Sequence, residues 1–143
     1  MAPPHIHNVQ IYYEDTDLSG VVYHANYLRY FERAREHLLG VSALVRLWDD
    51  HGIGFVVYKA GMTFREGASL GDGVDIRTTV HLESEYRLRF EQNAYRVACS
   101  EVACEPKLLV EGLVELVCVD REKKLCRLPD NVVQELINKT GTA

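Results

Sequence analysis

The feature that most constrains the fold is a change in hydrophobic period part-way along the chain. Residues 24–39 carry apolar side chains at the spacing of an amphipathic helix, with Tyr27, Phe31 and Leu38 on one face. From residue 55 to residue 119 the apolar residues follow strand-like patterns instead. One block of helix followed by strands that short turns connect predicts an α+β fold with an antiparallel sheet.

The remaining elements are predicted from local patterns. They are a strand over 7–13, a short helix over 42–52 capped by Ser42, strands over 55–64, 74–82, 86–99 and 108–119, and a terminal helix over 130–138. A slip in the apolar phase of the 86–99 strand predicts a bulge or a strong bend near Gln92 and Asn93. We expect these elements to form one domain over residues 1–143.

One helix of this length is too small to cover both faces of a five-stranded sheet. The uncovered face or edge would then be buried by a second copy of the chain, so we expect a homo-oligomer that is at least a dimer.

Composition and charge exclude several classes of function. The formal net charge of −5 gives a field that repels polyanions, so nucleic-acid binding is not expected. No stretch resembles a signal peptide or a span of about 20 apolar residues, so we expect no membrane insertion and a cytoplasmic location. The four cysteines match neither a C-x-x-C redox pair nor a zinc knuckle, and we expect reduced thiols that mostly pack as small apolar groups.

Residues 14–36, EDTDLSGVVYHANYLRYFERARE, place two aspartates, a Ser-Gly turn and a Tyr-His pair directly ahead of the predicted helix. Short polar side chains such as those of Asp15 and Asp17 commonly serve only as turn and cap residues. The D-T-D-L-S-G run also matches the opening of a calcium loop. However, Asn26 stands where that loop needs a bidentate Glu, and the preceding segment is strand-like instead of helical. We therefore expect no metal.

A catalytic role is the third interpretation of this stretch. A helix start presents unpaired N–H groups and a partial positive charge, which stabilise an oxygen that becomes negative in a transition state. A carboxylate held just ahead of that start can attack the same carbonyl carbon, or it can deprotonate a water that does. The sequence leaves both roles open.

The run Y-Y-E-D-T-D-L-S-G-V-V-Y-H-A-N-Y-L-R-Y-F-E-R-A-R-E resembles the signature of the small hotdog-fold acyl-CoA thioesterases of the 4-hydroxybenzoyl-CoA thioesterase superfamily. It is most similar to the bacterial branch associated with the Tol-Pal system. The sequence is also similar at four further sites: F-V-V-Y-K at 55–59, L-G-D at 70–72, L-V-C-V-D at 116–120 and R-L-P-D at 127–130. The resemblance implies a hotdog fold, in which a five-stranded antiparallel sheet wraps a long central helix. It also implies dimers with active sites between subunits, often assembled into tetramers.

The resemblance further implies an enzyme that hydrolyses acyl-CoA to free CoA and a carboxylic acid without a cofactor. Its acidic catalytic residue would be Asp17, acting as nucleophile or as general base. Its oxyanion donor would be a backbone N–H around Tyr23 and His24, with the His24 side chain beside the thioester. The supporting residues on the substrate side would be Tyr13, Asp15 and Asn26.

Two arginines are candidates for binding the rest of the substrate. Arg87 and Arg89 alternate with apolar residues on a predicted strand, so they form either a solvated face or a site for the phosphates of CoA. The alternative function is a non-hydrolytic hotdog protein, either an acyl-thioester hydratase or dehydratase or an acyl-CoA-binding module. Because of the resemblance to the Tol-Pal-associated branch, cell-envelope or phospholipid-synthesis proteins are further candidate partners.

Overall fold

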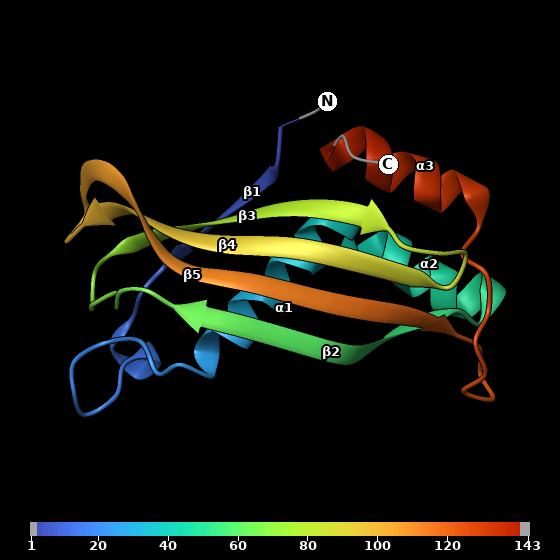
Figure 1. Ribbon diagram of the computed structural model, residues 1–143, viewed down its shortest axis with the longest axis horizontal. Coiled ribbons are helices and arrows are strands. Elements are labelled where there is room, and N and C mark those ends of the chain that lie inside the picture. The colour runs from blue at the N-terminus through green and yellow to red at the C-terminus, as the bar shows by residue number, and fades with distance from the viewer. Residues whose placement is uncertain (1–2, 141–143) are drawn as a thin grey trace.

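The computed structural model describes residues 3–140, which form one five-stranded sheet with helices against it (Figure 1). The elements in chain order are β1 (His5–Gln10), the 3-10 turn η1 (Tyr13–Asp15), α1 (Asn26–Leu39), α2 (Val41–His51), β2 (Gly54–Phe64), β3 (Gly73–Leu82), β4 (Arg87–Cys99), β5 (Val102–Val119) and α3 (Asp130–Thr140). The predicted α+β class and the predicted antiparallel sheet are confirmed.

The strands lie in the order β1-β3-β4-β5-β2, and every neighbouring pair is antiparallel. Buried residues face each other across the register, as where Val80 pairs with Phe90 and Phe90 pairs with Val114. Within the described residues β2 pairs only with β5 and β1 pairs only with β3, so these two strands form the edges of the sheet.

The helix α1 packs on one face of this sheet with the apolar side that the sequence predicts. Its buried residues include Tyr27, Phe31 and Leu38. The helix lies very close to the sheet at Gly112 of β5, where an added Cβ would clash with the Phe31 ring and lie 2.7 Å from the carbonyl oxygen of Gln92. Only glycine allows the helix and strand to lie this close. The helix spans 14 residues, because the chain before Asn26 is a turn.

The irregularity predicted near Gln92 and Asn93 is present, but it begins directly after Ala94. Gln92 is fully buried in regular β4 pairing, and the register shifts between Ala94 and Tyr95 and between Arg96 and Ala98. The Gln92 side chain lies on the buried side because three buried partners satisfy it. Its amide donates to the Phe31 carbonyl at 2.9 Å and to the Thr78 hydroxyl at 3.1 Å, and its oxygen accepts from the Arg35 guanidinium at 2.9 Å.

The other differences from the prediction concern the residues at which helices and strands begin. Gly40 and not Ser42 precedes the first turn of α2, and no side chain caps that helix. Gly40 has φ of 90°, a backbone conformation that glycine adopts without strain, so α2 begins directly after α1. β5 begins at Val102 instead of residue 108, since its first residues complete a hairpin with β4. None of the helices in residues 3–140 is both long enough and apolar enough to span a bilayer.

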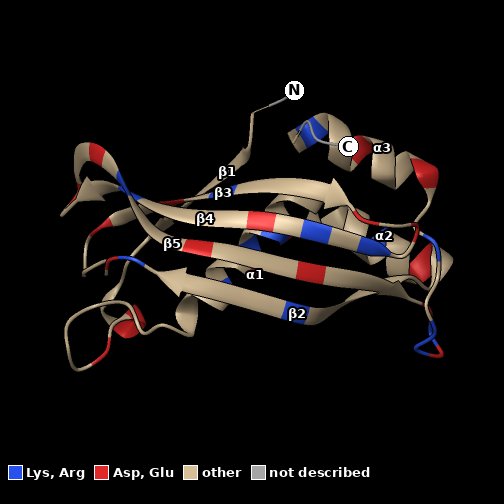
Figure 2. Ribbon diagram, viewed as in Figure 1, with Lys and Arg blue, Asp and Glu red and all other residues tan. Residues whose placement is uncertain are grey.

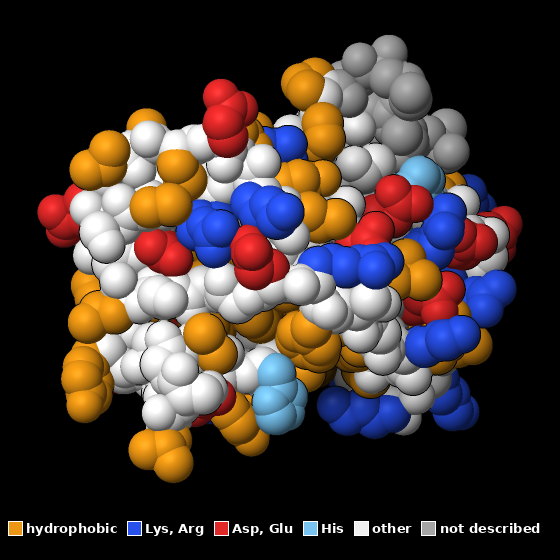
Figure 3. Space-filling model, turned by 60° about the vertical axis from the view of Figure 1, so that its left-hand side comes forward, with side chains coloured by type: hydrophobic (Ala, Val, Ile, Leu, Met, Phe, Trp, Pro, Cys, Tyr) orange, Lys and Arg blue, Asp and Glu red, His pale blue; other side chains and the backbone are white. Residues whose placement is uncertain are grey.

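Three segments meet at the left-hand end of the sheet in Figure 1: the loop between η1 and α1, the turn between β2 and β3, and the β4–β5 hairpin. One isolated bridge, Thr16 with Val22, lies within the first of these segments, and another, Val21 with Ser69, joins the first segment to the second. With this end turned forward, Figure 3 shows exposed hydrophobic side chains beside charged ones. The fold therefore brings the loop that contains residues 15–17, called the D-T-D loop below, against a turn about fifty residues further along the chain.

Candidate active site

Asp17 lies at the centre of a tight loop that fixes its carboxylate. The Ser19 N–H donates to Asp17 Oδ1 at 2.9 Å, and the Ser19 hydroxyl donates to the same oxygen at 2.6 Å. The Asp17 N–H donates to the Val21 carbonyl, and the Gly20 N–H donates to the Asp17 carbonyl. The loop closes tightly because Gly20 has a φ of 85°. One carboxylate oxygen is thus held by the loop.

These hydrogen bonds also change the pKa of the Asp17 carboxyl group. The hydrogen bond from the Ser19 side chain lowers the pKa of Asp17 below 3.8, and the backbone N–H groups and nearby His24 act in the same direction. Asp17 is therefore a carboxylate at neutral pH.

Asp15 braces the loop and does not line the Asp17 cavity. Its carboxylate accepts the Tyr12 N–H at 2.8 Å. Its backbone carbonyl accepts two further bonds, from the Tyr23 N–H at 2.9 Å and from the Asn26 side-chain amide at 2.9 Å. Asp15 and Asn26 together attach the D-T-D loop to the start of α1. A role of either residue on the substrate side stays a prediction.

The start of α1 offers N–H groups next to this loop. The Tyr23 N–H is already bonded to Asp15, and the Asn26 N–H is bonded to the Tyr23 carbonyl. Within residues 3–140, the N–H groups of His24 and Ala25 donate to no other atom. Because the Tyr23 N–H already donates to Asp15, the candidates for the oxyanion donor are the N–H of His24, which the prediction included, and that of Ala25, which it did not name. The Tyr23 ring lies against the His24 ring, with the ring centres 4.6 Å apart.

Asp17 and His24 open into one cavity of about 310 Å³. Its walls come from the D-T-D loop, from α1 and from the end of β2 with the turn that follows: Asp17, Val21, Val22, His24, Tyr27, Phe64, Arg65, Glu66 and Gly67. The Phe64 ring meets the His24 ring edge-on at 6.1 Å. Burial raises the pKa of Tyr27 to about 12, so its hydroxyl keeps its proton at neutral pH. The cavity thus combines an anionic carboxylate, a helix start and aromatic walls.

The cation of this cavity is Arg65, which sequence reasoning missed. It forms an exposed ion pair with Glu111 at 2.6 Å. Arg87 and Arg89 do not line the cavity. Along β5, the cavity residue Phe64 pairs with Val110, whereas Arg87 pairs with Val117. At about 3.3 Å per residue, Arg87 therefore lies about 23 Å further along the sheet than Phe64.

The two predicted arginines have other partners in the chain. Arg89 lies 2.6 Å from Glu83, and Arg87 donates to the Tyr58 hydroxyl at 3.3 Å. Figure 2 shows basic and acidic residues spaced along β4 and acidic residues along β5. Tyr13 is 81% exposed in η1 and also lies outside the cavity. A contact of Tyr13, Arg87 or Arg89 with substrate stays a prediction.

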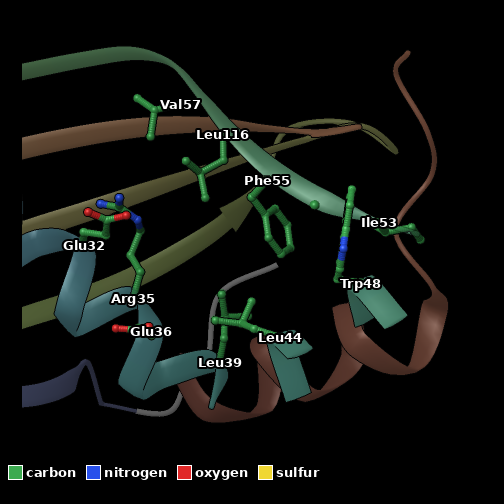
Figure 4. A pocket seen from close by; sticks show the side chains of 11 residues that line it. Glu32, Arg35, Glu36, Leu39, Leu44, Trp48, Ile53, Phe55, Val57 and Leu116 are labelled. Carbon is green, nitrogen blue, oxygen red and sulfur yellow. The ribbon is translucent and has the colours of Figure 1, made fainter. Parts of the chain in front are cut away.

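A second cavity, of about 370 Å³, lies between α1, α2 and β2 (Figure 4). Its apolar walls include Leu44, Trp48 and Phe55, while Glu32 and Arg35 project from α1 on the other side. It shares no lining residue with the Asp17 cavity. Across residues 3–140, no three His, Cys, Asp or Glu side chains gather in an arrangement that could hold a metal ion.

Comparison with known proteins shows the family to which the chain belongs. Residues 12–136 match the model of the thioesterase-like superfamily. The chain belongs to the thioesterase-like superfamily. It is 37% identical over 133 residues to the acyl-CoA thioester hydrolase YbgC of Escherichia coli O6:H1, covering 89% of this chain and 91% of that protein. It is 34% identical over 117 residues to the acyl-CoA thioesterase YbgC of Haemophilus influenzae, covering 80% of each.

The fold agrees with this membership. The solved structure of the Dynemicin thioesterase superposes with a TM-score of 0.85 and 23% identity, covering 98% of both chains. At this level of identity the likeness shows the fold alone, which is the hotdog fold that the resemblance implies. The prediction of a thioester hydrolase is confirmed at the level of the superfamily. The closer link to the Tol-Pal-associated branch stays a prediction.

Proposed function

We propose that this member of the thioesterase-like superfamily hydrolyses acyl-CoA thioesters in the Asp17 cavity. The observation that carries the proposal is the pairing of two features in one cavity. Asp17 is held as a carboxylate by Ser19, and the His24 N–H at the start of α1 has no partner among the described residues. A nucleophilic oxygen and a donor for the opposing oxyanion are the two groups that acyl transfer needs.

We infer that Asp17 attacks the thioester carbon itself. A general base works best when its pKa lies near the working pH, and the Ser19 hydrogen bond moves the pKa of Asp17 the other way. A carboxylate nucleophile needs no proton transfer to act. The attacking oxygen forms a bond to the acyl carbon, the carbon–sulfur bond breaks, and CoA leaves as the thiolate. Water then hydrolyses the resulting mixed anhydride, which releases the carboxylic acid and restores Asp17.

The start of α1 would stabilise the charge that develops during this attack. The carbonyl oxygen of the thioester becomes negative as the Asp17 oxygen approaches, and the N–H groups of His24 and Ala25 are its donors. The partial positive charge of the helix N-terminus adds to their effect. The rings of Phe64 and Tyr27 line the same cavity and give it an apolar wall beside the reacting carbonyl.

Two further parts of the proposal concern CoA and assembly. Arg65 lies on the rim and suits a phosphate of CoA, which this acidic protein can bind only through a local cation. The open edge of β2 carries exposed Val56, Val57 and Tyr58, and a second copy of the chain would cover them. We infer a homo-oligomer in which α1 is the central helix of each hotdog unit.

A panel of acyl-CoAs with a thiol-reactive dye tests the proposed function. Wild-type protein should release thiol from at least one aliphatic or aromatic acyl-CoA, and Asp17→Asn should not. The matched control is Asp50→Asn, because Asp50 is a solvent-exposed residue of α2 that does not line the Asp17 cavity. If the wild type releases no more thiol than Asp17→Asn from any member of the panel, the hydrolase proposal is overturned. Binding of acyl-CoA without thiol release would support the non-hydrolytic alternative.

A further inference from the structure

The β4–β5 hairpin holds two thiols in contact. Cys99 is the last residue of β4 and Cys104 lies near the start of β5, and their sulfur atoms are 3.0 Å apart. A disulfide needs about 2.05 Å between the sulfurs, so closure requires an approach of about 1 Å. Cys99 is exposed, in contrast to the prediction that the cysteines mostly pack as small apolar groups.

The turn between these thiols is held in an unusual conformation. Ser100 and Glu101 have φ of 48° and 69°, although neither is glycine. The Ser100 N–H donates to Asp72 Oδ1 at 3.3 Å, and the Glu101 N–H donates to the Gly71 carbonyl at 3.2 Å. Asp72 is buried, and its other oxygen accepts the Ser69 N–H at 2.9 Å. The β2–β3 turn thus fixes the hairpin that places the two sulfurs together.

Arg96 connects the same thiols to the Asp17 cavity. Its guanidinium donates to Glu66 Oε2 at 2.8 Å and to the Gly67 carbonyl at 3.1 Å, and both of these residues line the cavity. The hydrogen bond with Cys99 raises the pKa of the Cys104 thiol and partial burial adds to this, while the nearby Arg96 opposes both. Cys104 therefore keeps its proton at neutral pH until a partner reacts with it.

We propose that Cys99 and Cys104 are an oxidisable pair that a hydroperoxide converts to a disulfide, and that closure acts on the cavity wall through Arg96 and Asp72. The peroxide transfers one oxygen to the exposed Cys99 sulfur, which gives a sulfenic acid and releases water. The Cys104 sulfur then attacks that sulfur, and its proton leaves with the hydroxyl as a second water. Two thiols and one hydrogen peroxide thus give one disulfide and two waters.

The other two cysteines provide a control within the same chain. Cys118 is buried, and burial raises its pKa to about 12. Burial also raises the pKa of Cys126, with Asp120 adding to the effect. Because a thiolate reacts with peroxide far faster than a thiol, these two should stay reduced under conditions that oxidise the pair.

Mass spectrometry tests the disulfide. Trypsin releases both thiols in one peptide, residues 97–107, and cleavage after Glu101 divides it. After limited hydrogen peroxide, this peptide should lose two hydrogen atoms, resist alkylation, and keep its halves joined until a reductant is added. The Cys104→Ser variant should instead give separate halves and stop at oxidised Cys99. If the wild-type halves separate without reductant after every peroxide dose, the proposed disulfide does not form.

Hydrogen exchange tests the connection to the cavity and requires no activity. A cross-link across the hairpin restricts its opening, so amides that depend on the hairpin should exchange more slowly after oxidation. The expected sites are the N–H groups of Ser69 and Glu101, with the Leu44 N–H in α2 as an unaffected reference. Cys104→Ser should show no such slowing under the same peroxide. Unchanged exchange at Ser69 in a wild type shown to carry the disulfide would overturn the connection.

Discussion

Gln92 makes the core of this thioesterase-like protein depend on a single polar side chain. Replacing it by Met fills a similar volume, so the cavity term stays small, but it removes three buried hydrogen bonds. The two neutral bonds, to Phe31 and Thr78, contribute about 1 kcal/mol each, and the bond from the Arg35 guanidinium contributes about 1.5–3 kcal/mol. Gln92→Met should therefore lower the free energy of unfolding by about 3.5–5 kcal/mol. In a domain of this size that corresponds to a Tm about 10–15 °C lower.

The assay is thermal unfolding at one fixed protein concentration, because an oligomer's Tm depends on concentration. Arg35→Met should also destabilise, since it leaves the Gln92 oxygen without its donor. The double variant Gln92→Met/Arg35→Met should lose clearly less than the sum of the single losses, because no charged group is then left buried without a partner. A loss below about 1 kcal/mol for Gln92→Met would refute the reasoning, since such a value is typical of an exposed surface site.

Three further predictions concern the loop, the histidines and the cavity wall. Ser19→Ala removes the bond that lowers the pKa of Asp17, so the acid limb of the kcat/KM profile should move to higher pH; an unmoved limb contradicts the role of Ser19. Burial, with neighbouring cations, lowers the pKa of His7 below 6.5, so the unfolded chain takes up a proton first as the pH falls. Stability should decline below about pH 6.5, and His7→Gln should reduce that decline in Tm measurements; an equal decline in both proteins counts against it. An added Cβ at Gly67 would lie 2.8 Å from the Val21 side chain, so Gly67→Ala should lower kcat/KM, whereas Gly61→Ala, with open space around it, should not. Equal effects of these two glycine variants would show that the crowding is unimportant.

Regular patterns predict most of this fold. The buried face of α1 and the alternation of Val74, Ile76 and Val80 follow from period alone, because each element must bury one apolar side. The burial of Gln92 could not be predicted from such periodicity. A polar residue is buried only when specific partners satisfy it, and those partners come from α1 and β3, far away in the sequence.

The candidate site also contains some residues that the sequence predicts and others that it does not. Asp17 and His24 lie close together in the sequence, and the structure places both in one cavity. The D-x-S spacing that lets Ser19 bond Asp17 is a local turn pattern and could have been recognised. Arg65 carries no local signal, because its place at the rim depends on the pairing of β2 with β5. Arg87 and Arg89 alternate with apolar residues in the sequence, yet the pairing of β4 with β5 places them at the other end of the sheet.

Attack by Asp17 on the acyl carbon is the central claim, and an acid-quenched single turnover with mass detection tests it most directly. Excess enzyme is mixed with a hydrolysed acyl-CoA, stopped at successive times and digested, and free CoA and carboxylic acid are quantified in each sample. We predict that CoA appears before the acid and that the peptide containing Asp17 transiently gains the mass of the acyl group. Simultaneous appearance of CoA and acid, with no acylated peptide at any time, would contradict the claim and indicate attack by water.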